Sequence, residues 1–458
     1  MGEHGLYGRL ARKQATALSI TGLALLLLTA AALAVAGALT QPAGNAGCIS
    51  ETGAGPCADG HGLSGANTAA VSPNGKNVYV ASDRTVVRLD RNTGTGAITE
   101  QGGAAACTSE TGAGPCADGH ALSVLFGLSV SPDGKSVYAV AQKSNAVVRF
   151  NRDTTTGAIT QPAGAAGCIS ETGAGPCADG HALSGADAVT VSPNGKSVYV
   201  TSLGGVVRLK RNTNTGAITQ PAGAAGCISE TGAGPCADGH GLKDGADSVT
   251  VSRDGKSVYV ASFVNNAVLR LKRNTTTGAI TQPAGAAGCI SETGAGPCVN
   301  GRALTGAVSV VVSRDGNHVY VAANTGDAVA RFNRNRTTGA IAQPAGAAGC
   351  ISETGAGPCA DGHALVGPLW LSLSPDGRNI YAASHKSDAV TRLNRNPSSG
   401  GLTQATGAAG CISETGSGPC ADGHALFSPL AVAVSADGKS VYAASLGSNA
   451  VARINRAP

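Results

Sequence analysis

The chain has 458 residues, of which 67 are glycine and only 3% are aromatic, and its formal net charge is +5. So few large side chains exclude a single thick hydrophobic core and favour thin apolar layers packed sheet on sheet. The small net charge excludes a nucleic-acid binder that relies on a strong basic excess.

The N-terminus has the pattern of an export signal. Basic Arg9, Arg12 and Lys13 precede an apolar stretch over residues 17–36 that ends in small side chains. The pattern predicts a signal peptide over residues 1–36 and a secreted or cell-surface protein. The alternative is an uncleaved membrane anchor, because about 20 apolar residues can span a bilayer.

Fourteen cysteines divide the chain into seven units, and the first cysteine of each pair recurs every 59 to 62 residues. An even number in an exported chain predicts a disulfide framework and an oxidising compartment. Each pair encloses eight residues rich in Gly and Pro, so a local disulfide is expected in every unit. Metal ligation is the alternative, but the spacing lacks the Cys-x2-Cys knuckle of zinc sites, and no metal or other cofactor is predicted. The expected pairs are Cys48/Cys57, Cys107/Cys116, Cys168/Cys177, Cys227/Cys236, Cys289/Cys298, Cys350/Cys359 and Cys411/Cys420.

The third unit illustrates the local structure expected in each repeat. Ala186 to Ser192 is a small apolar strand, and the turn Pro193 to Lys196 contains the Asn-Gly pair typical of hairpins. Ser197 to Ser202 and Val206 to Lys210 alternate with the period of two of β-strands. A fourth short strand is expected over Ala217 to Gln220, before the loop that the two cysteines enclose.

Seven units of four antiparallel strands predict an all-β fold, a seven-bladed β-propeller over residues 37–458, because a closed ring hides nearly all sheet edges. The last unit ends after three strands, and Gly37 to Gln41 copies the missing fourth. The N-terminal strand is therefore expected to close the last blade. A membrane helix ending at Ala36 would leave no linker before that strand, which favours cleavage.

Three motifs then resemble the seven-bladed lactonase-like propellers and related YVTN-type repeats: Ser-Pro-Asp-Gly-Lys-Ser-Val-Tyr at 131–138, Ser-Asn-Ala-Val at 144–147 and Thr-Gly-Ala-Ile-Thr at 156–160. The resemblance covers every blade. It implies either hydrolases like 6-phosphogluconolactonase, enzymes like muconate cyclases, or surface repeat proteins without known chemistry. The Cys-bounded loop departs from the family pattern, so no catalytic residue is transferred.

Six units carry Ala-Asp-Gly-His after the second cysteine. These residues are expected at the mouth of the central channel, where they would bind a hydroxyl-rich ligand or a cation, or else form a local turn closed by a hydrogen bond. The candidates are Asp59, His61, Asp118, His120, Asp179, His181, Asp238, His240, Asp361, His363, Asp422 and His424, with Arg302 at the histidine position of the fifth unit.

Every unit also repeats Arg-x-x-Arg in its third strand and one Glu in its Cys loop, such as Arg149, Arg152 and Glu171. Arg–Glu ion pairs are the expected explanation. A ring that grips acidic glycans is the alternative, although the small net charge opposes it.

Near-identical blades make catalysis difficult, because an acid and a base need different environments. Asymmetry comes from substitutions such as Arg302, Trp370 and Phe126, while His318 and His385 are interpreted as exposed replacements. The leading hypothesis is a binding or scaffold module for an extracellular ligand, such as a glycan or a small lactone. The alternative is a lactone hydrolase, for which an uneven cluster that includes Arg302 or Trp370 is expected around the channel, whereas a scaffold predicts a nearly seven-fold lining. No nucleic-acid partner is predicted, and a membrane only if the N-terminal segment is uncleaved.

Overall fold

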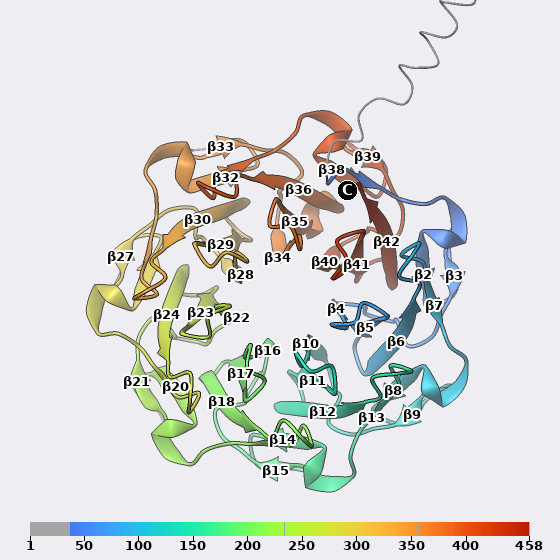
Figure 1. Ribbon diagram of the computed structural model, residues 1–458, viewed down its shortest axis with the longest axis horizontal. Helices are drawn as coiled ribbons and strands as arrows, with labels where there is room; N and C mark the ends of the chain where they lie inside the picture. Colours follow the sequence, from blue (N-terminus) through green and yellow to red (C-terminus); the bar gives the residue numbers. More distant parts are fainter. Residues whose placement is uncertain (1–36, 233, 356, 458) are drawn as a thin grey trace, which may run out of the picture.

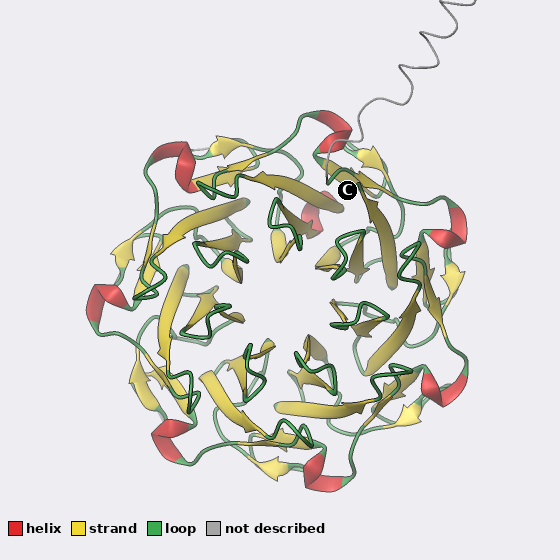
Figure 2. Ribbon diagram, in the orientation of Figure 1, coloured by secondary structure: helices red, strands yellow, loops and turns green. Residues whose placement is uncertain are grey.

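The computed structural model describes residues 37–457 except 233 and 356, and these residues form a ring of seven blades around one axis (Figure 1). Each blade is one six-stranded sheet, which confirms the predicted seven-bladed β-propeller. The helices of the described part are short 3-10 turns, most of them at the outer edge of the ring (Figure 2). None of them has the length and apolar character of a membrane span. The predicted signal peptide or anchor, residues 1–36, lies outside the described residues.

The elements repeat in the same order around the ring. Innermost lie β4 (Thr68–Val71), β10 (Leu125–Val130), β16 (Val189–Val191), β22 (Ser248–Val251), β28 (Ala307–Val312), β34 (Pro368–Leu373) and β40 (Pro429–Val434). Second are β5 (Asn77–Ala81), β11 (Ser136–Ala141), β17 (Ser197–Ser202), β23 (Ser257–Ser262), β29 (His318–Ala323), β35 (Asn379–Ser384) and β41 (Ser440–Ser445). Third are β6 (Thr85–Arg91), β12 (Ala146–Arg152), β18 (Gly205–Arg211), β24 (Ala267–Arg273), β30 (Ala328–Arg334), β36 (Ala389–Arg395) and β42 (Ala450–Arg456).

Two short strands share the fourth position of each blade, and a fifth strand lies outermost. The first pieces are β1 (Leu39–Thr40), β7 (Ile98–Glu100), β13 (Ile159–Thr160), β19 (Ile218–Thr219), β25 (Ile280–Thr281), β31 (Ile341–Ala342) and β37 (Leu402–Thr403). The second pieces begin at a cysteine: β2 (Cys48–Ser50), β8 (Cys107–Ser109), β14 (Cys168–Ser170), β20 (Cys227–Glu230), β26 (Cys289–Ser291), β32 (Cys350–Ser352) and β38 (Cys411–Ser413). The outermost strands are β3 (Ala58–Asp59), β9 (Ala117–Asp118), β15 (Ala178–Asp179), β21 (Ala237–Gly239), β27 (Val299–Asn300), β33 (Ala360–Asp361) and β39 (Ala421–Asp422).

Short 3-10 turns precede the cysteine strands, and one more lies in the sixth blade. They are η1 (Gly44–Ala46), η2 (Gly103–Ala105), η3 (Gly164–Ala166), η4 (Gly223–Ala225), η5 (Gly285–Ala287), η6 (Gly346–Gly349), η7 (His385–Ser387) and η8 (Gly407–Ala409).

The predicted fourth strand forms, but the Cys loop adds two strands that the sequence pattern did not indicate. In the second blade β13 pairs with the end of β12, Ile159 opposite Arg152, and β14 pairs with its beginning, Ile169 opposite Val147. The loop then reverses so that β15 runs parallel to β14, with Ala178 opposite Ile169.

All seven predicted disulfides are present, each within its own loop. They are Cys48–Cys57, Cys107–Cys116, Cys168–Cys177, Cys227–Cys236, Cys289–Cys298, Cys350–Cys359 and Cys411–Cys420. The Cα atoms of each pair lie 4.7 to 4.8 Å apart, within the usual range for a disulfide. The seven bonds therefore repeat one geometry around the ring.

The segment after each disulfide does not lead directly to the channel, which corrects the sequence interpretation. The second cysteine of every pair stands directly before an outermost strand rather than in a loop that leads to the channel. These cysteines are Cys57, Cys116, Cys177, Cys236, Cys298, Cys359 and Cys420. Each disulfide therefore ties the outermost strand of a blade to the cysteine strand beside it.

The two ends of the chain meet in the seventh blade, as predicted. β1 pairs with the end of β42, Leu39 opposite Arg456, and β2 pairs with its beginning, Ile49 opposite Val451. The first disulfide, Cys48–Cys57, therefore belongs to the last blade. The ring has no open sheet edge at its seam.

The hydrophobic core lies in layers between neighbouring blades. All residues of β11 are buried, because the second strand of a blade is covered on both faces. Tyr138 and Val140 of the second blade pack in one cluster with Leu183, Val198 and Val200 of the third. Small Val and Ala residues suit these thin layers, which explains the low aromatic content.

The register of the strands defines two opposite faces of the ring. The turn face carries the Pro-Asp/Asn-Gly turns between first and second strands, together with the ends of the third strands, since Ser136 lies opposite Asn151. The hairpin face carries the loops between second and third strands and the beginnings of the first strands, since Leu125 lies opposite Ala141.

Candidate functional site

The Asp-His segments lie at the outer rim of the ring, so the prediction that they surround the channel mouth is wrong. Asp59, Asp118, Asp179, Asp361 and Asp422 end the outermost strands, as does Asn300 in the fourth blade, and Asp238 lies within one (Figure 1). Each of these side chains is exposed. The extra parallel strand carries the chain outward before it turns toward the axis, and that reversal is what the sequence pattern did not reveal.

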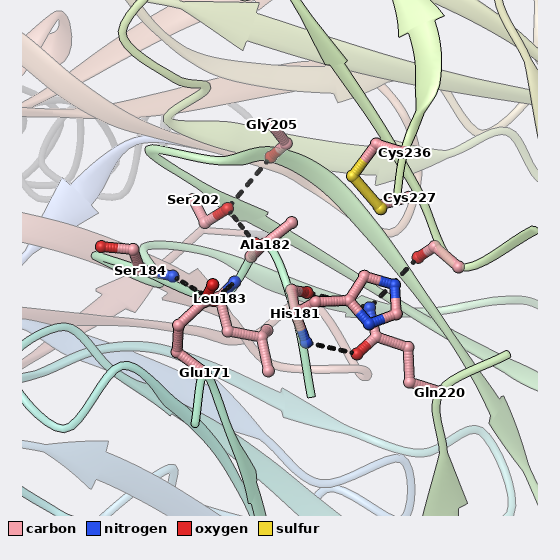
Figure 3. Close-up of a disulfide and its surroundings, with 11 residues drawn as sticks. Glu171, His181, Ala182, Leu183, Ser184, Ser202, Gly205, Gln220, Cys227 and Cys236 are labelled. Atoms are coloured by element: carbon pink, nitrogen blue, oxygen red, sulfur yellow. Dashed lines mark hydrogen bonds between the residues drawn. A yellow bond between two sulfur atoms is a disulfide. The ribbon is translucent and has the colours of Figure 1, made fainter. Parts of the chain in front are cut away.

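The histidines that follow these aspartates join the rim of one blade to the segment that follows the short fourth strand of the next blade. The His181 N–H donates to Gln220 Oε1 at 2.9 Å, and Gln220 Nε2 donates to the His181 carbonyl at 2.9 Å (Figure 3). His181 Nε2 is buried without a hydrogen-bond partner among the described residues. The same backbone exchange recurs at His120, His240, Arg302, His363 and His424. Their backbone role is therefore structural, and binding by their side chains remains a prediction.

The cysteines beside these histidines are structural as well. The fourteen cysteines form seven disulfides, so none of them is a free thiol. In this state none of them can supply a thiolate to a metal ion or act as a nucleophile, because both roles need the deprotonated thiol. The second cysteines Cys57, Cys116, Cys177, Cys236, Cys298, Cys359 and Cys420 thus hold the Asp-His segments at the rim.

The Glu residues of the Cys loops accept backbone N–H groups of the segment that leads to the next blade. Among the described residues none of these glutamates forms an ion pair with arginine. Glu171 Oε2 accepts the backbone N–H groups of Leu183 and of Ser184, the latter at 3.0 Å (Figure 3). The predicted Arg–Glu ion pairs are therefore wrong. A carboxylate that accepts two backbone N–H groups stabilises a link that contains no regular structure.

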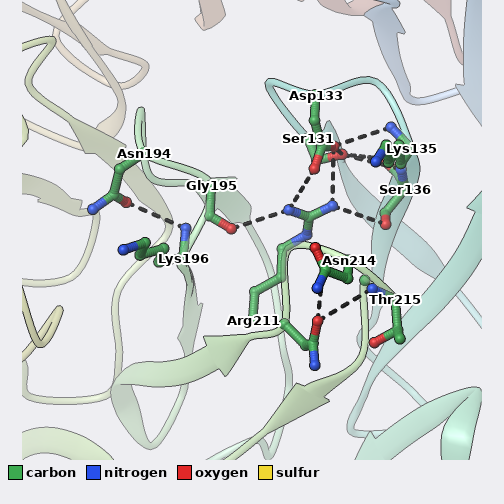
Figure 4. Close-up of polar contacts among 12 residues, drawn as sticks. Ser131, Asp133, Lys135, Ser136, Asn194, Gly195, Lys196, Arg211, Asn214 and Thr215 are labelled. Carbon is green, nitrogen blue, oxygen red and sulfur yellow. Dashed lines mark hydrogen bonds and ion pairs between the residues drawn. The ribbon is translucent and has the colours of Figure 1, made fainter.

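The second arginine of each Arg-x-x-Arg motif joins neighbouring blades instead. Arg211 donates to Tyr138 Oη at 2.7 Å. It also contacts the turn carboxylate of Asp133 at 2.9 Å (Figure 4). Tyr138 Oη in turn donates to the Gly216 carbonyl at 2.6 Å. The same Arg–Tyr bond occurs at every one of the seven junctions.

Burial and charge act in opposite directions on this network. Burial alone would raise the pKa of Asp133, but hydrogen bonds from Arg211, Ser131 and the Lys135 N–H outweigh it and lower the pKa. Burial raises the pKa of Tyr138, so the phenol keeps its proton and can donate to Gly216. The arginines therefore serve the fold.

Two clefts at the rim bring histidine and glutamate together. One, of about 450 Å³, is lined by His61, Asp83, Arg84 and the glutamates of two successive Cys loops, Glu51 and Glu110. The next blade has a cleft of about 410 Å³ lined by His120, Lys143, Glu110 and Glu171. The structure therefore groups the predicted histidines with Glu rather than with the Asp two residues before them.

Asymmetry appears at the axis, at one repeat position of which sequence reasoning had named only Phe126. This position lies at the hairpin-face end of each innermost strand: the N–H groups of Asp187 and Asp247 donate to the Thr201 and Ala261 carbonyls at 2.9 and 3.0 Å. In four blades the residue at the same position forms a β-bulge in the pairing of the first and second strands, as at Phe126 between Leu125 and Gly127. Around the ring the residues are Asn67, Phe126, Asp187, Asp247, Val308, Leu369 and Leu430.

The two aspartates of the third and fourth blades form an axial acidic pair. Asp247 Oδ2 accepts the Phe263 N–H at 2.6 Å, and burial, which this bond opposes, raises the pKa of Asp247 to about 6. Burial, and next to it the nearby charge of Asp247, raises the pKa of Asp187 well above its ordinary value. Both carboxyl groups of the pair thus have raised pKa values, and two neighbouring carboxyl groups perturbed in this way are suited to acid–base chemistry.

Exposed apolar side chains flank the pair on the hairpin face. Phe126, Leu203, Phe263 and Val264 belong to the second, third and fourth blades and are 38 to 61% exposed. The lining near the axial acidic pair therefore differs between blades. Of the two residues expected in an uneven cluster, Arg302 lies at the rim, where its Nη2 donates to the Pro344 carbonyl, and Trp370 lies in β34 of the sixth blade. A comparison of the seven repeats position by position would have found the pair.

Two histidines differ from their interpretation as exposed replacements. His318 begins β29 and is buried, and its Nδ1 lies 2.8 Å from Arg395 Nη2. Burial, together with Arg395, lowers the pKa of His318 to about 4, so the ring is neutral at physiological pH. His385 is half-buried in η7, with Nδ1 2.7 Å from the Gly367 carbonyl. Among the described residues no cluster of three His, Cys, Asp or Glu is placed to hold a metal ion.

The model of one protein family matches most of this ring. The family is described as Lactonase, 7-bladed beta-propeller, and the match covers residues 166–420. The chain therefore belongs to the lactonase family of seven-bladed β-propellers.

Solved structures show the same fold at low identity. A protein from Bacteroides uniformis named as a candidate 6-phosphogluconolactonase is 18% identical, with a TM-score of 0.50, over 73% of this chain and 82% of that one. The periplasmic gluconolactonase of Pseudomonas aeruginosa is 16% identical, with a TM-score of 0.51, over 76% and 86%. The Cps50 (Swd1) propeller domain of Myceliophteria thermophila is 11% identical, with a TM-score of 0.51, over 85% and 96%. A comparison with curated proteins returns no match.

Proposed function

We propose that the protein is a lactone hydrolase whose reacting groups are the axial acidic pair. The observation that carries the proposal is the placement of Asp187 and Asp247 just before two adjacent innermost strands, where burial raises the pKa of each, in a family named for lactonases. The flanking Phe126 and Phe263 would contact the apolar face of a lactone ring.

The chemistry needs one proton acceptor and one proton donor. Ionised Asp247 removes a proton from water as the water oxygen bonds to the lactone carbonyl carbon. When the tetrahedral intermediate collapses, the ring C–O bond breaks, and protonated Asp187 transfers its proton to the departing alkoxide. The product is a hydroxy acid, and proton exchange between the two carboxyl groups through solvent restores the starting state.

Base uptake at constant pH, measured on a panel of sugar and muconate lactones with a heat-unfolded control, tests the proposal. Asp247→Asn and Asp187→Asn are each expected to lower kcat by about 10² or more, the usual worth of a general base or acid. Asp244→Asn is the matched control, since Asp244 is exposed near the same strand and the charge change is the same. Wild-type rates equal to those of Asp187→Asn/Asp247→Asn on every lactone would overturn it.

A second function is favoured by the rim clefts. We propose that these clefts bind hydroxyl-rich extracellular ligands such as glycans, weakly at each blade and more strongly together. The seven disulfides support an oxidising, extracellular location for such a role. Retention on polysaccharide columns that is reduced in His120→Ala/Lys143→Ala, which alters one cleft, would support it, and retention unchanged by that variant would contradict it.

A further inference from the structure

A cleft on the turn face of the fourth blade collects four cationic side chains. It has a volume of about 560 Å³ and is lined by Lys256, Arg270, Lys272 and Arg273, together with Thr337 and Thr338 of the next blade. No carboxylate belongs to this lining. Lys256 and Lys272 are exposed, whereas the two arginines are only 4% and 5% exposed.

Both buried guanidinium groups contact neutral acceptors alone among the described residues. Arg270 donates to the Ala287 carbonyl at 3.3 Å and to the Thr338 carbonyl. Arg273 donates to Tyr199 Oη at 2.6 Å, to the Gly255 carbonyl at 2.9 Å, and to Asn194 Oδ1 and Ser197 Oγ. A buried cation without a counter-charge is costly, so the cleft attracts an anion.

The first blade shows what the same cleft looks like when the protein supplies its own anions. That cleft, of about 540 Å³, is lined by Lys76, Arg88, Asp90 and Arg91. Arg88 Nη2 lies 2.7 Å from Asp90, and Arg91 Nη2 lies 3.0 Å from the turn carboxylate of Asp437. Each arginine of the first blade therefore has a carboxylate partner.

Both carboxylates are replaced in the fourth blade. Lys272 stands at the position of Asp90, and Asn194 stands at the position of Asp437. The third blade carries Lys210 at the first position, but its Arg211 keeps the Asp133 partner. The second blade has neutral residues at both positions, Asn151 and Asn74, which accept from its arginines. The fourth blade alone combines the loss of both carboxylates with an added lysine.

We propose that this cleft binds a tetrahedral oxyanion, phosphate or sulfate, as the free ion or as an ester. Two ammonium groups on flexible stems can close on the oxygens of the ion, while the fixed guanidinium groups beneath supply positive charge. The cleft opens on the turn face, opposite the axial acidic pair, so this site stands independently of the proposed hydrolase.

Titration calorimetry of the full chain with inorganic phosphate, inorganic sulfate and a sugar phosphate, at constant ionic strength set with sodium chloride, tests the site. Wild type is expected to bind at least one of the three with one site per chain. Lys272→Asp recreates the Arg–Asp pair of the first blade and is expected to weaken binding at least tenfold. Lys210→Asp makes the same charge change in the third blade and is expected to alter the affinity less than twofold.

Thermal unfolding of both variants verifies that the fold is retained, which the natural Asp90 leads us to expect. Affinity reduced equally by Lys272→Asp and Lys210→Asp would overturn the proposal, because the ion would then respond to overall charge alone. The absence of saturable heat with all three ligands in folded wild type would overturn it as well. Lactone hydrolysis is expected to be unchanged in Lys272→Asp, so failure here is separable from failure of the proposed hydrolase.

Discussion

The tyrosine at each blade junction contributes hydrogen bonds between the blades in addition to packing. Tyr138 accepts from Arg211 of the next blade and donates to Gly216 of that same blade, so one phenol oxygen links two strands and a turn. Seven such phenols occur at equivalent, fully buried positions. Polar contacts buried at this depth are costly to break on one side only.

Tyr138→Phe is expected to lower the free energy of unfolding by about 1 to 3 kcal/mol, because Arg211 and the Gly216 carbonyl each lose a buried partner. Asp133→Asn is the mild comparison, since Asn74 and Asn194 occupy the same turn position in other blades. Chemical unfolding followed by circular dichroism measures both. Equal losses for the two variants would contradict the role given to the phenol.

The axial acidic pair predicts a dependence of stability on pH. The pKa of Asp247 is about 6 in the folded protein and close to 3.8 when unfolded, so ionisation disfavours the folded state. The contribution of Asp247 is fully present below about pH 4 and is lost as the pH rises through 6. Asp247→Asn should therefore be more stable than wild type at pH 7, by about 2 kcal/mol, and similar at pH 4. Thermal unfolding across this range measures the difference, and a gain that does not change with pH would contradict the assignment.

At the scale of elements, the Cys loop is the part of each blade that departs from the repeat pattern of the family. Its disulfide ties β14 to the link before β15, and its Glu171 fixes the chain beyond. The loop thereby builds the outermost strand of each blade from a segment rich in Gly and Pro. It also displaces the Asp-His residues from the axis to the rim.

Replacing Cys168 and Cys177 by alanine should remove up to about 2.7 kcal/mol of stability, the loop-closure value for ten residues. The outermost strand is expected to open first, because two-residue strands such as β15 have few backbone bonds. Hydrogen exchange measures local opening, and mass spectrometry of non-reduced peptides verifies the remaining pairs. Unchanged exchange over residues 171–181 would contradict this.

At the scale of the molecule, closure depends on the chain ends meeting. β42 pairs with β1 and β2 on its outer side, and Tyr381 donates to the Gly37 carbonyl at 3.0 Å. Without these strands the third strand of the seventh blade has an unpaired edge, which favours association with other chains.

A chain that begins at residue 61 is expected to dimerise or aggregate, because it lacks β1, β2 and β3. A chain that begins at residue 37 keeps all three and is the control. Size-exclusion chromatography with light scattering compares the two. A monomeric, cooperatively unfolding chain from residue 61 would show that closure by the N-terminal strands is dispensable.

Features that lie within one repeat unit could be predicted from the sequence. Contacts between side chains of neighbouring units could not. Strands, turns, disulfides and ring closure follow from local patterns and from counting repeats. The partner of Arg211 is Asp133, 78 residues away in the preceding blade, and spacing within a unit cannot reveal it. Phe126 was named as a substitution that breaks the repeat, but Asp187 and Asp247 were missed because the equivalent positions of the seven units were not compared with one another.

The junction of both chain ends in one blade also sets an order of events in biosynthesis. β1, β2 and β3 are made before every other strand of the ring, yet β42, with which β1 and β2 pair, is made after all the others. Six blades can assemble from contiguous chain while these leading strands wait unpaired, with only the Cys48–Cys57 bond available to hold their hairpin. The ring therefore closes only when β1 and β2 pair with β42. The rate of this step is limited by the entropy lost in closing a loop nearly as long as the ring-forming part of the chain.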